Sequence, residues 1–382
     1  MSDSRGRMDA AIADSFMREA LALAEQAIGL SDPNPRVGCV IVGTDGTVLG
    51  RGHTQAAGDA HAEVMALRDA ASRGTDVGGT DVRGATVFVS LEPCSHHGRT
   101  PPCADALVAA GVGRVVMAMR DPNPLVAGRG TARLAAAGIV VDDGPRAEEA
   151  HELNIGFVSR MARGRPWLRM KVAVSLDGRT ALADGTSQWI TGEAARADGH
   201  AWRKRAGAVL TGAGTVRDDD PRLDVRHVET ARQPLRVVVD SRLETPPDAR
   251  IVAPPGQVLL YAAIDDGPRR RALEARGVAI ALLPSSGGKV DLAAMVADLG
   301  ARGINELHVE AGEKLNASLL AAGLVDELLV YVAPSLIGDG RGLAALGGVA
   351  RLDDKLAFEF THVERIGSDL RLRLRPIPRP AR

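Results

Sequence analysis

Residues 86–103 read TVFVSLEPCSHHGRTPPC, and the first half of the chain is organised around this stretch. Its first six residues, 86–91, are mostly β-branched or apolar and predict a strand. Cys94 follows two residues after this strand, and Cys103 immediately precedes an Ala-rich run, 104–110, that predicts a helix. The two cysteines are therefore expected at a strand-to-helix connection.

On both sides of this stretch, apolar runs alternate with Ala-rich helical runs. In the first half, strands are expected at 37–42, 48–52, 86–91, 114–119 and 138–141, and helices at 8–30, 62–72, 104–110 and 131–137. After Arg165-Pro166, strands are expected at 168–174, 208–211, 235–240, 258–262, 278–283, 306–310 and 328–333, and helices at 194–205, 269–276, 292–301 and 315–322. This alternation predicts an α/β fold in which helices cover a largely parallel sheet.

With 382 residues, the chain is long enough for two or three domains. A turn at Asp142-Asp143-Gly144-Pro145 and an acidic helical segment after it separate the two alternations, so residues 144–166 are expected to form a linker. The boundary is placed near residue 150, which gives a first domain over 1–150 and a second over 151–382.

Composition narrows the classes of partner. The chain has 47 Lys and Arg against 48 Asp and Glu, a formal net charge of -1, so it offers no electrostatic reason to bind long nucleic acid or an anionic membrane. Aromatic residues at 3% are too scarce for base-stacking platforms. The N-terminus has the pattern of neither a signal peptide nor a membrane anchor. Three cysteines make a disulfide framework improbable, and a cytoplasmic protein with reduced thiols is expected.

One imidazole and two thiols are spaced as in a catalytic zinc site. His61 and Glu63 open the helical run at 62–72, and Cys94 and Cys103 follow. His61, Cys94 and Cys103 suit one Zn²⁺ per chain and leave the fourth tetrahedral position for water, while Glu63 is placed to carry protons as a general acid and base.

The simpler alternative is a pair of buried cysteines beside a helix-capping histidine. Three other histidines could also complete the metal coordination, which would make the site closed and structural: His53, His96 and His97. As a set, His-x-Glu followed by Pro-Cys and a second Cys matches the signature of zinc deaminases.

Four motifs together closely resemble the bifunctional pyrimidine deaminase-reductases of riboflavin biosynthesis, over nearly the whole chain. They are DPNPRVG at 32–38, HAE at 61–63, LEPCSHHGRTPPC at 91–103 and DPNP at 121–124. The resemblance implies a cytidine-deaminase-like three-layer domain followed by a dihydrofolate-reductase-like domain. It implies hydrolytic loss of the 2-amino group, as ammonia, from a diaminopyrimidinone carrying a ribosylamino 5′-phosphate. NADPH then reduces the ribosyl group to ribityl.

The resemblance also implies roles in the deaminase half. Asn34, Asp121 and Asn123 would hold the pyrimidine, while His96 and Arg99 would face the phosphate end. A guanidinium such as that of Arg99 is in its own right a plausible phosphate ligand, although a loop this polar could equally be a solvated connection.

In the second half, a strand at 306–310 leads through Gly312 into a helix, and such a helix N-terminus is suited to a cofactor pyrophosphate. The resemblance implies cofactor contacts by Ala173, Trp189, Thr215, Asp219, Ser241, Gly312, Glu313, Lys314, Leu315, Asn316, Ala317 and Ser318. It implies substrate contacts by Lys171, Ser187, Arg203, Leu223, Arg226 and Glu310, of which Arg203 and Arg226 would clamp the phosphate.

Two other functions stay open at this point. One is a nucleic-acid base deaminase with a docking domain, and the other is a non-catalytic metabolite-binding protein with degenerate sites. The expected partners are a small phosphorylated pyrimidine, no nucleic acid, no membrane, and further copies of the chain in a dimer or tetramer formed through the second domain.

Overall fold

The protein is described by a computed structural model that covers residues 9–73, 81–95, 101–124, 126–253, 256–348 and 350–378. The chain divides into two compact units, Met1–Arg163 and Gly164–Arg382. The division lies after the expected boundary at residue 150 and within the expected linker. Helices α5 (Ala147–Leu153) and α6 (Ile155–Arg163) belong to the first unit because their apolar side chains, among them Leu153 and Phe157, pack into its core.

The first unit is built on a five-stranded mixed sheet. Besides α5 and α6, its elements are α1 (Ala10–Glu25), β1 (Gly38–Val42), β2 (Val48–His53), α2 (Ala62–Arg73), β3 (Thr86–Val89), α3 (Cys103–Ala110), β4 (Arg114–Met117), α4 (Arg129–Ala136) and β5 (Val140–Asp143). The strand order is β2-β1-β3-β4-β5. Strand β1 is antiparallel to β2 and β3, whereas β3, β4 and β5 are parallel.

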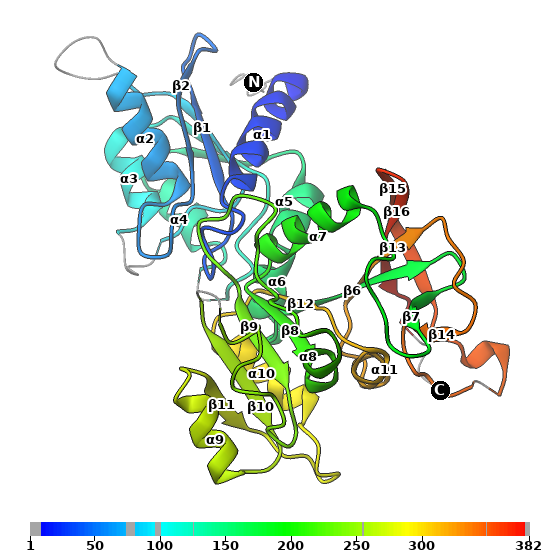
Figure 1. Ribbon diagram of the computed structural model, residues 1–382. Coiled ribbons are helices and arrows are strands. Elements are labelled where there is room, and N and C mark those ends of the chain that lie inside the picture. The colour runs from blue at the N-terminus through cyan, green and yellow to red at the C-terminus, as the bar shows by residue number, and fades with distance from the viewer. Residues whose placement is uncertain are drawn as a thin grey trace. The chain divides into compact units, whose positions relative to one another are not determined.

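Alternating side chains of β1 show why this unit has three layers. Cys39 and Ile41 point to one face, where they join the cluster that contains the apolar residues of α2 and α3. Val40 and Val42 point to the opposite face and pack with α1. A strand whose two faces are both apolar must be covered on both sides, and Figure 1 shows α1 and the α2–α3 pair in those places.

Gly52 in β2 allows α2 to lie directly on the sheet. A Cβ built on Gly52 would come within 2.3 Å of the carbonyl oxygen of Ala62, the first residue of α2. Only glycine permits so close an approach of helix and strand. This contact fixes the N-terminus of α2, where His61 and Glu63 stand.

The second unit contains a nine-stranded sheet. Its elements are β6 (Trp167–Ser175), β7 (Arg179–Leu182), α7 (Glu193–Arg205), β8 (Ala208–Gly212), α8 (Ala213–Asp219), β9 (Leu235–Val239), β10 (Val258–Ala262), α9 (Gly267–Glu274), β11 (Ala279–Leu282), α10 (Leu292–Ala301), β12 (Glu306–Val309), α11 (Glu313–Ala321), β13 (Glu327–Ala333), β14 (Gly340–Gly342), the 3₁₀ helix η1 (Leu352–Asp354), β15 (Phe358–Ile366) and β16 (Asp369–Pro376). The order is β11-β10-β9-β8-β12-β6-β13-β16-β15, and β7 pairs with β14 in a separate small sheet.

Seven neighbouring strands, β11 to β13 in that order, are parallel, as the alternation predicts. Helices α10 and α11 cover one face through Met295, Leu299 and Leu319, while α8 and α9 cover part of the other. The antiparallel hairpin of β15 and β16 was not expected, although residues 369–374 read DLRLRL with the period of two that is typical of a strand. Within the described ranges, none of the helices is both long and apolar enough to cross a membrane.

Candidate functional site

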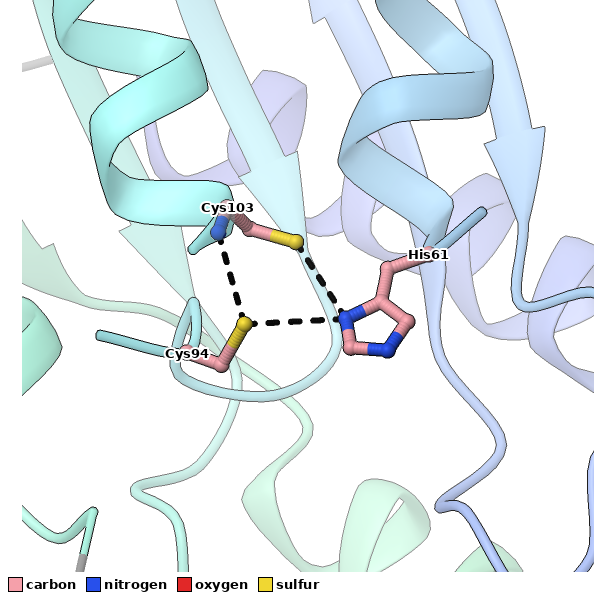
Figure 2. A group of neighbouring side chains, drawn as sticks. All are labelled: His61, Cys94 and Cys103. Atoms are coloured by element: carbon pink, nitrogen blue, oxygen red, sulfur yellow. Dashed lines mark hydrogen bonds between the residues drawn. The ribbon is translucent and has the colours of Figure 1, made fainter. Parts of the chain in front are cut away.

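The three side chains predicted to bind zinc converge in the first unit (Figure 2). Their ligand atoms all lie within 4.8 Å of one another. The Nδ1 atom of His61 is 3.6 Å from Sγ of Cys94 and 3.3 Å from Sγ of Cys103. His61 immediately precedes α2, Cys103 begins α3, and Cys94 lies in the loop after β3. His53 is outside this group, and His96 and His97 lie outside the described residues.

The electrostatics of this group suit a divalent cation. Hydrogen bonds from the Cys103 thiol, from His61 and from the Cys103 backbone N–H lower the pKa of the Cys94 thiol to about 4. The pKa of Cys103 is raised, chiefly because its thiol donates to Cys94 and also because it is buried. A cation placed among the three atoms would stabilise both thiolates and release the remaining proton, as expected for zinc ligands.

Glu63 lies in the first turn of α2 with a side chain that is only 3% exposed. Burial, and then the negative charge of Cys94, raise the pKa of Glu63 to about 7. A carboxyl group that exchanges its proton near neutral pH, close to three side chains able to bind a metal, is suited to general acid and base catalysis.

These residues border a pocket of about 390 Å³. His61, Glu63 and Cys94 line it, and so do three residues predicted to hold the pyrimidine: Asn34, Asp121 and Asn123. The Asn123 N–H donates to Oδ1 of Asp121 at 2.8 Å, which orders the loop that carries both. The pocket therefore joins a metal-ligand set to polar side chains able to orient a small heterocycle.

The pocket is also lined by residues of α6 that were not expected there. His96 and Arg99, expected at the phosphate end, lie outside the described residues. Helix α6 supplies Phe157, Arg160 and Met161, which the sequence analysis did not select, and Arg160 donates to the carbonyl of Pro33 at 3.0 Å. Their i, i+3, i+4 spacing places the three residues on one face of the helix, and this spacing was the sequence signal that could have indicated a shared surface.

In the second unit, four of the residues predicted to contact substrate form one charged cluster. Glu310 pairs with Arg203 and, at 3.8 Å, with Lys171 Nζ. Arg203 also donates to the carbonyl oxygen of Asp224 at 3.0 Å, and the carboxylate of Asp224 accepts from Arg226 Nη1 at 2.7 Å. Burial lowers the pKa of Lys171, but Glu310 opposes that shift. Arginines held in this way present a preorganised site for an anion.

Asp224 and His200 are the residues of this cluster that the sequence analysis missed. The backbone N–H of Arg226 donates to Nδ1 of His200 at 3.4 Å, so His200 accepts through that atom. Burial, with the nearby positive charges of Arg203 and Arg226, lowers the pKa of His200 to about 3 and keeps the ring neutral. Leu223, another predicted substrate residue, is buried beside them with a φ of 51°. An Asp or His between arginines carries no clear sequence signal, because the contacts are set by the fold.

Most of the residues predicted to contact the cofactor follow the ends of β8 and β12. Glycines precede α8 and α11 at Gly212 and Gly312, and neither helix has a side-chain cap. A Cβ added to Gly312 would lie 3.6 Å from the hydroxyl of Thr215, so these two predicted residues are neighbours. The uncapped N–H groups of α11 after a glycine fit a cofactor phosphate.

The other predicted cofactor residues have varied surroundings. Asn316 is buried, and its amide donates to the carbonyls of Ala311 and Leu343. Asp219 accepts a hydrogen bond of 3.0 Å from the hydroxyl of Ser187, a predicted substrate residue. Trp189 is 65% exposed, and the guanidinium carbon of Arg196 lies 4.7 Å from the centre of its ring.

Three more of the predicted cofactor residues make contacts within the fold. Ala173 pairs with Tyr331 in the sheet, the Ser241 hydroxyl accepts from the Val290 N–H, and Glu313 accepts from the Gly342 N–H. In helix α11, Leu315 packs on the core, Ala317 is half-buried, and Lys314 and Ser318 are exposed.

Two family descriptions match the chain. The cytidine and deoxycytidylate deaminase zinc-binding region matches residues 11–119, and the RibD C-terminal domain matches residues 166–372. The two matches cover parts of the first and second units respectively and confirm the fold class expected for each half.

Curated relatives match along nearly their full length. The riboflavin biosynthesis protein RibD of Escherichia coli is 47% identical over 372 residues, which cover 94% of this chain and 98% of the relative. The protein of the same name from Aquifex aeolicus is 38% identical, with 93% of this chain and 96% of the relative covered.

Solved structures match in the same way. Acinetobacter baumannii RibD superposes with a TM-score of 0.87 at 40% identity, covering 97% of this chain and all of that one. A diaminohydroxyphosphoribosylaminopyrimidine deaminase/5-amino-6-(5-phosphoribosylamino)uracil reductase from Thermotoga maritima gives a TM-score of 0.85 at 32% identity, with coverages of 96% and 99%.

Proposed function

This chain belongs to the RibD family of riboflavin biosynthesis proteins, and we propose that its two units divide the two reactions of the family between them. The chain is a bifunctional enzyme of riboflavin biosynthesis, a deaminase and a reductase, with Zn²⁺ and NADPH as cofactors. We assign the deaminase to the unit that ends at Arg163 and the reductase to the unit that begins at Gly164, because each contains a separate charged site.

The observation that carries the deaminase assignment is the shared pocket of His61, Cys94, Glu63 and the Asp121–Asn123 loop. We assign His61, Cys94 and Cys103 as the zinc ligands. When bound, zinc acts as a Lewis acid that activates water for attack on the pyrimidine. Asn34, Asp121 and Asn123 orient the ring so that the carbon bearing the 2-amino group faces the metal.

Glu63 moves the protons of this reaction. Hydrolytic deamination moves both protons of water: the first reaches a ring nitrogen as the hydroxyl adds to the carbon, and the second passes from that hydroxyl to the departing amine, so that ammonia leaves and a carbonyl remains. The carboxyl group of Glu63 has a pKa of about 7 and can therefore accept the first proton and return it. Burial of the side chain keeps solvent from competing for that proton.

In the reductase, the charged cluster is proposed to bind the sugar phosphate of the deaminated product. Arg203 and Arg226 supply guanidinium groups that pair with phosphate, while Lys171 and Glu310 hold the sugar. The N-terminus of α11 with Thr215 is assigned to the cofactor. When bound, NADPH would supply a hydride to the ribosyl carbon as the bond from that carbon to the ring oxygen breaks, and the oxygen would take a proton from water. The remaining work of the protein is to hold sugar and cofactor in contact.

We further propose that the enzyme is a cytoplasmic homo-oligomer assembled through the second unit. Strand β15 is the outer strand of the nine-stranded sheet and exposes Phe360 (63%) and Val363 (57%). An edge strand that exposes apolar side chains is able to pair with a second copy of the chain. The cytoplasm is supported by the three free thiols, Cys39, Cys94 and Cys103, since two of them must stay reduced to bind zinc.

The decisive experiment separates the two reactions. The diaminopyrimidinone ribosylamino phosphate is supplied with and without NADPH, and ammonia release and NADPH oxidation are followed independently. Ammonia should appear without NADPH, and oxidation should follow once the deaminated product has formed. If NADPH were oxidised on the undeaminated substrate with no release of ammonia, the proposal that deamination precedes reduction would be contradicted.

A further inference from the structure

Glu92 stands two residues before Cys94 and lines the pocket, but none of the chemical steps above uses it. Its side chain is 3% exposed and accepts four hydrogen bonds. Oε2 accepts from the backbone N–H groups of Asp121 (3.2 Å) and Gly128 (3.0 Å). Oε1 accepts from the backbone N–H and the hydroxyl of Thr131, both at 3.1 Å.

These bonds tie together three segments that are distant in the sequence. Glu92 itself precedes the predicted zinc ligand Cys94, Asp121 begins the loop predicted to hold the pyrimidine, and Gly128 and Thr131 flank the start of α4. The backbone N–H of Glu92 also donates to the carbonyl of Met119 at 3.0 Å, which adds a second link to the segment between β4 and this loop.

The packing around Glu92 leaves little room for adjustment. A Cβ on Gly130 would come within 1.9 Å of the carbonyl oxygen of Pro93, so α4 lies directly on the backbone between Glu92 and Cys94. The N-cap of α4, Gly128, supplies no side-chain cap, and the carboxylate of Glu92 takes over that function. A buried carboxylate with four donors is stable in one arrangement of those donors, because any displacement leaves a buried polar group without its partner.

We propose that Glu92 is a positioning residue of the deaminase, which sets the place of the Asp121–Asn123 loop relative to Cys94. Since Cys94 is a proposed metal ligand and the loop is proposed to hold the pyrimidine, Glu92 keeps the loop in the arrangement that binds the pyrimidine beside the metal site, and its loss should weaken that binding. This inference rests on the proposed function of Asp121 and Asn123.

Glu92→Gln tests the proposal with almost no change in size. Each carboxylate oxygen of Glu92 accepts from at least one backbone N–H group. Whichever oxygen is replaced by the NH₂ group of glutamine, two donors then face each other and at least one hydrogen bond is lost. We expect KM for the pyrimidine to rise about tenfold, the effect of disturbing one or two buried hydrogen bonds, and kcat to change by less than about threefold. Zinc content and NADPH oxidation on the deaminated product should stay at the wild-type level, since a general loss of folding would lower both.

Three matched variants complete the test. Thr131→Val removes only the hydroxyl donor and should leave KM within about twofold. Glu92→Asp keeps the charge with a shorter reach, so its KM should lie between those of the wild type and Glu92→Gln. Asn123→Ala checks the premise and should raise KM.

The outcomes separate the inference from its premise. If Asn123→Ala leaves KM unchanged, the proposed role of the loop is wrong. If Asn123→Ala raises KM while zinc-loaded Glu92→Gln or Glu92→Asp does not, the loop binds the pyrimidine and the positioning role of Glu92 is overturned. Should Glu92→Gln not fold, the Asp variant, which keeps a carboxylate opposite the same donors, decides the question alone.

Discussion

The Nδ1 atom of His61 lies 3.3 Å from the sulfur of Cys103, a residue 42 positions later in the chain. Each stands at the start of a helix that packs on the same face of the sheet, so the fold itself brings the two ligand atoms together. In this preformed arrangement, the proposed ligands could bind one metal without reorganising the backbone.

Purified protein should contain about one zinc per chain. Replacement of both Cys94 and Cys103 by Ser should abolish the zinc, because serine hydroxyls are poor zinc ligands. Elemental analysis of the folded variants measures this directly. Cys39→Ala is the matched control: Cys39 is a buried core thiol outside the ligand group, and its loss should leave the zinc content unchanged. Full zinc occupancy in the double variant would refute the ligand assignment.

Glu63→Gln should retain zinc and lower the deamination rate by about 10² or more, since the amide can neither take nor return a proton. NADPH oxidation on already deaminated product should be unaffected, because it depends on the second unit. Stopped assays of ammonia and absorbance assays of NADPH distinguish the two. If both activities fell together, Glu63 would be needed for the structure as a whole.

Arg226→Ala should weaken use of the phosphorylated substrate by the reductase by about 1.5 to 3 kcal/mol, or about 10- to 150-fold in kcat/KM. A dephosphorylated analogue should be affected little. Arg222 is the matched control, because it pairs with the same carboxylate, Asp224, at 2.9 Å. Arg222→Ala should therefore reproduce any structural effect without the loss of phosphate recognition. Equal losses on both substrates would exclude the phosphate role of Arg226.

Acid should destabilise the second unit through Glu327. Burial raises the pKa of this carboxyl, but Arg169 and Arg373 outweigh that effect and hold the pKa at about 2. The folded-state pKa is thus below the ordinary value of 4.5, so the stabilisation is complete above pH 4.5 and is lost as pH falls toward 2. The loss amounts to about 3 kcal/mol.

The tryptophans allow this to be measured in the whole chain, because all three, Trp167, Trp189 and Trp202, belong to the second unit. Urea unfolding followed by their fluorescence should show Glu327→Gln destabilised by about 3 kcal/mol at pH 7 and by about half as much at pH 3. Glu359→Gln, at an exposed position of β15, should match the wild type at both pH values. A Glu327→Gln deficit that does not shrink in acid would show that the charge is not the cause.

The proposed assembly through β15 predicts that Phe360→Glu combined with Val363→Lys dissociates the oligomer, since charges on an edge strand oppose pairing. Light scattering after size exclusion gives the mass of the particle. Leu352→Lys removes an apolar side chain that is 76% exposed elsewhere in the same unit and should not change the mass. A wild-type protein that is monomeric at assay concentration would end this proposal.

The sequence by itself determined the chemistry and most of the architecture. The alternation of helices and strands depends on local periodicity, so the parallel strands of both units and the helices at 62–72 and 292–301 could be predicted from it. His61, Glu63, Cys94 and Cys103 could be selected because few functions require those residue types in that order.

Only the tertiary structure decided which other residues share the site. Glu92 and Arg160 are ordinary charged residues whose partners lie 29 or more positions away, and Asp224 is joined to Arg203 across 21 positions. No local pattern records such contacts. The same holds for the edge position of β15, which depends on the strand order of the whole sheet. Side-chain burial and hydrogen bonding arise only once distant segments are packed together. For that reason the sequence indicates the proposed ligands of the site but not the residues that pack around them.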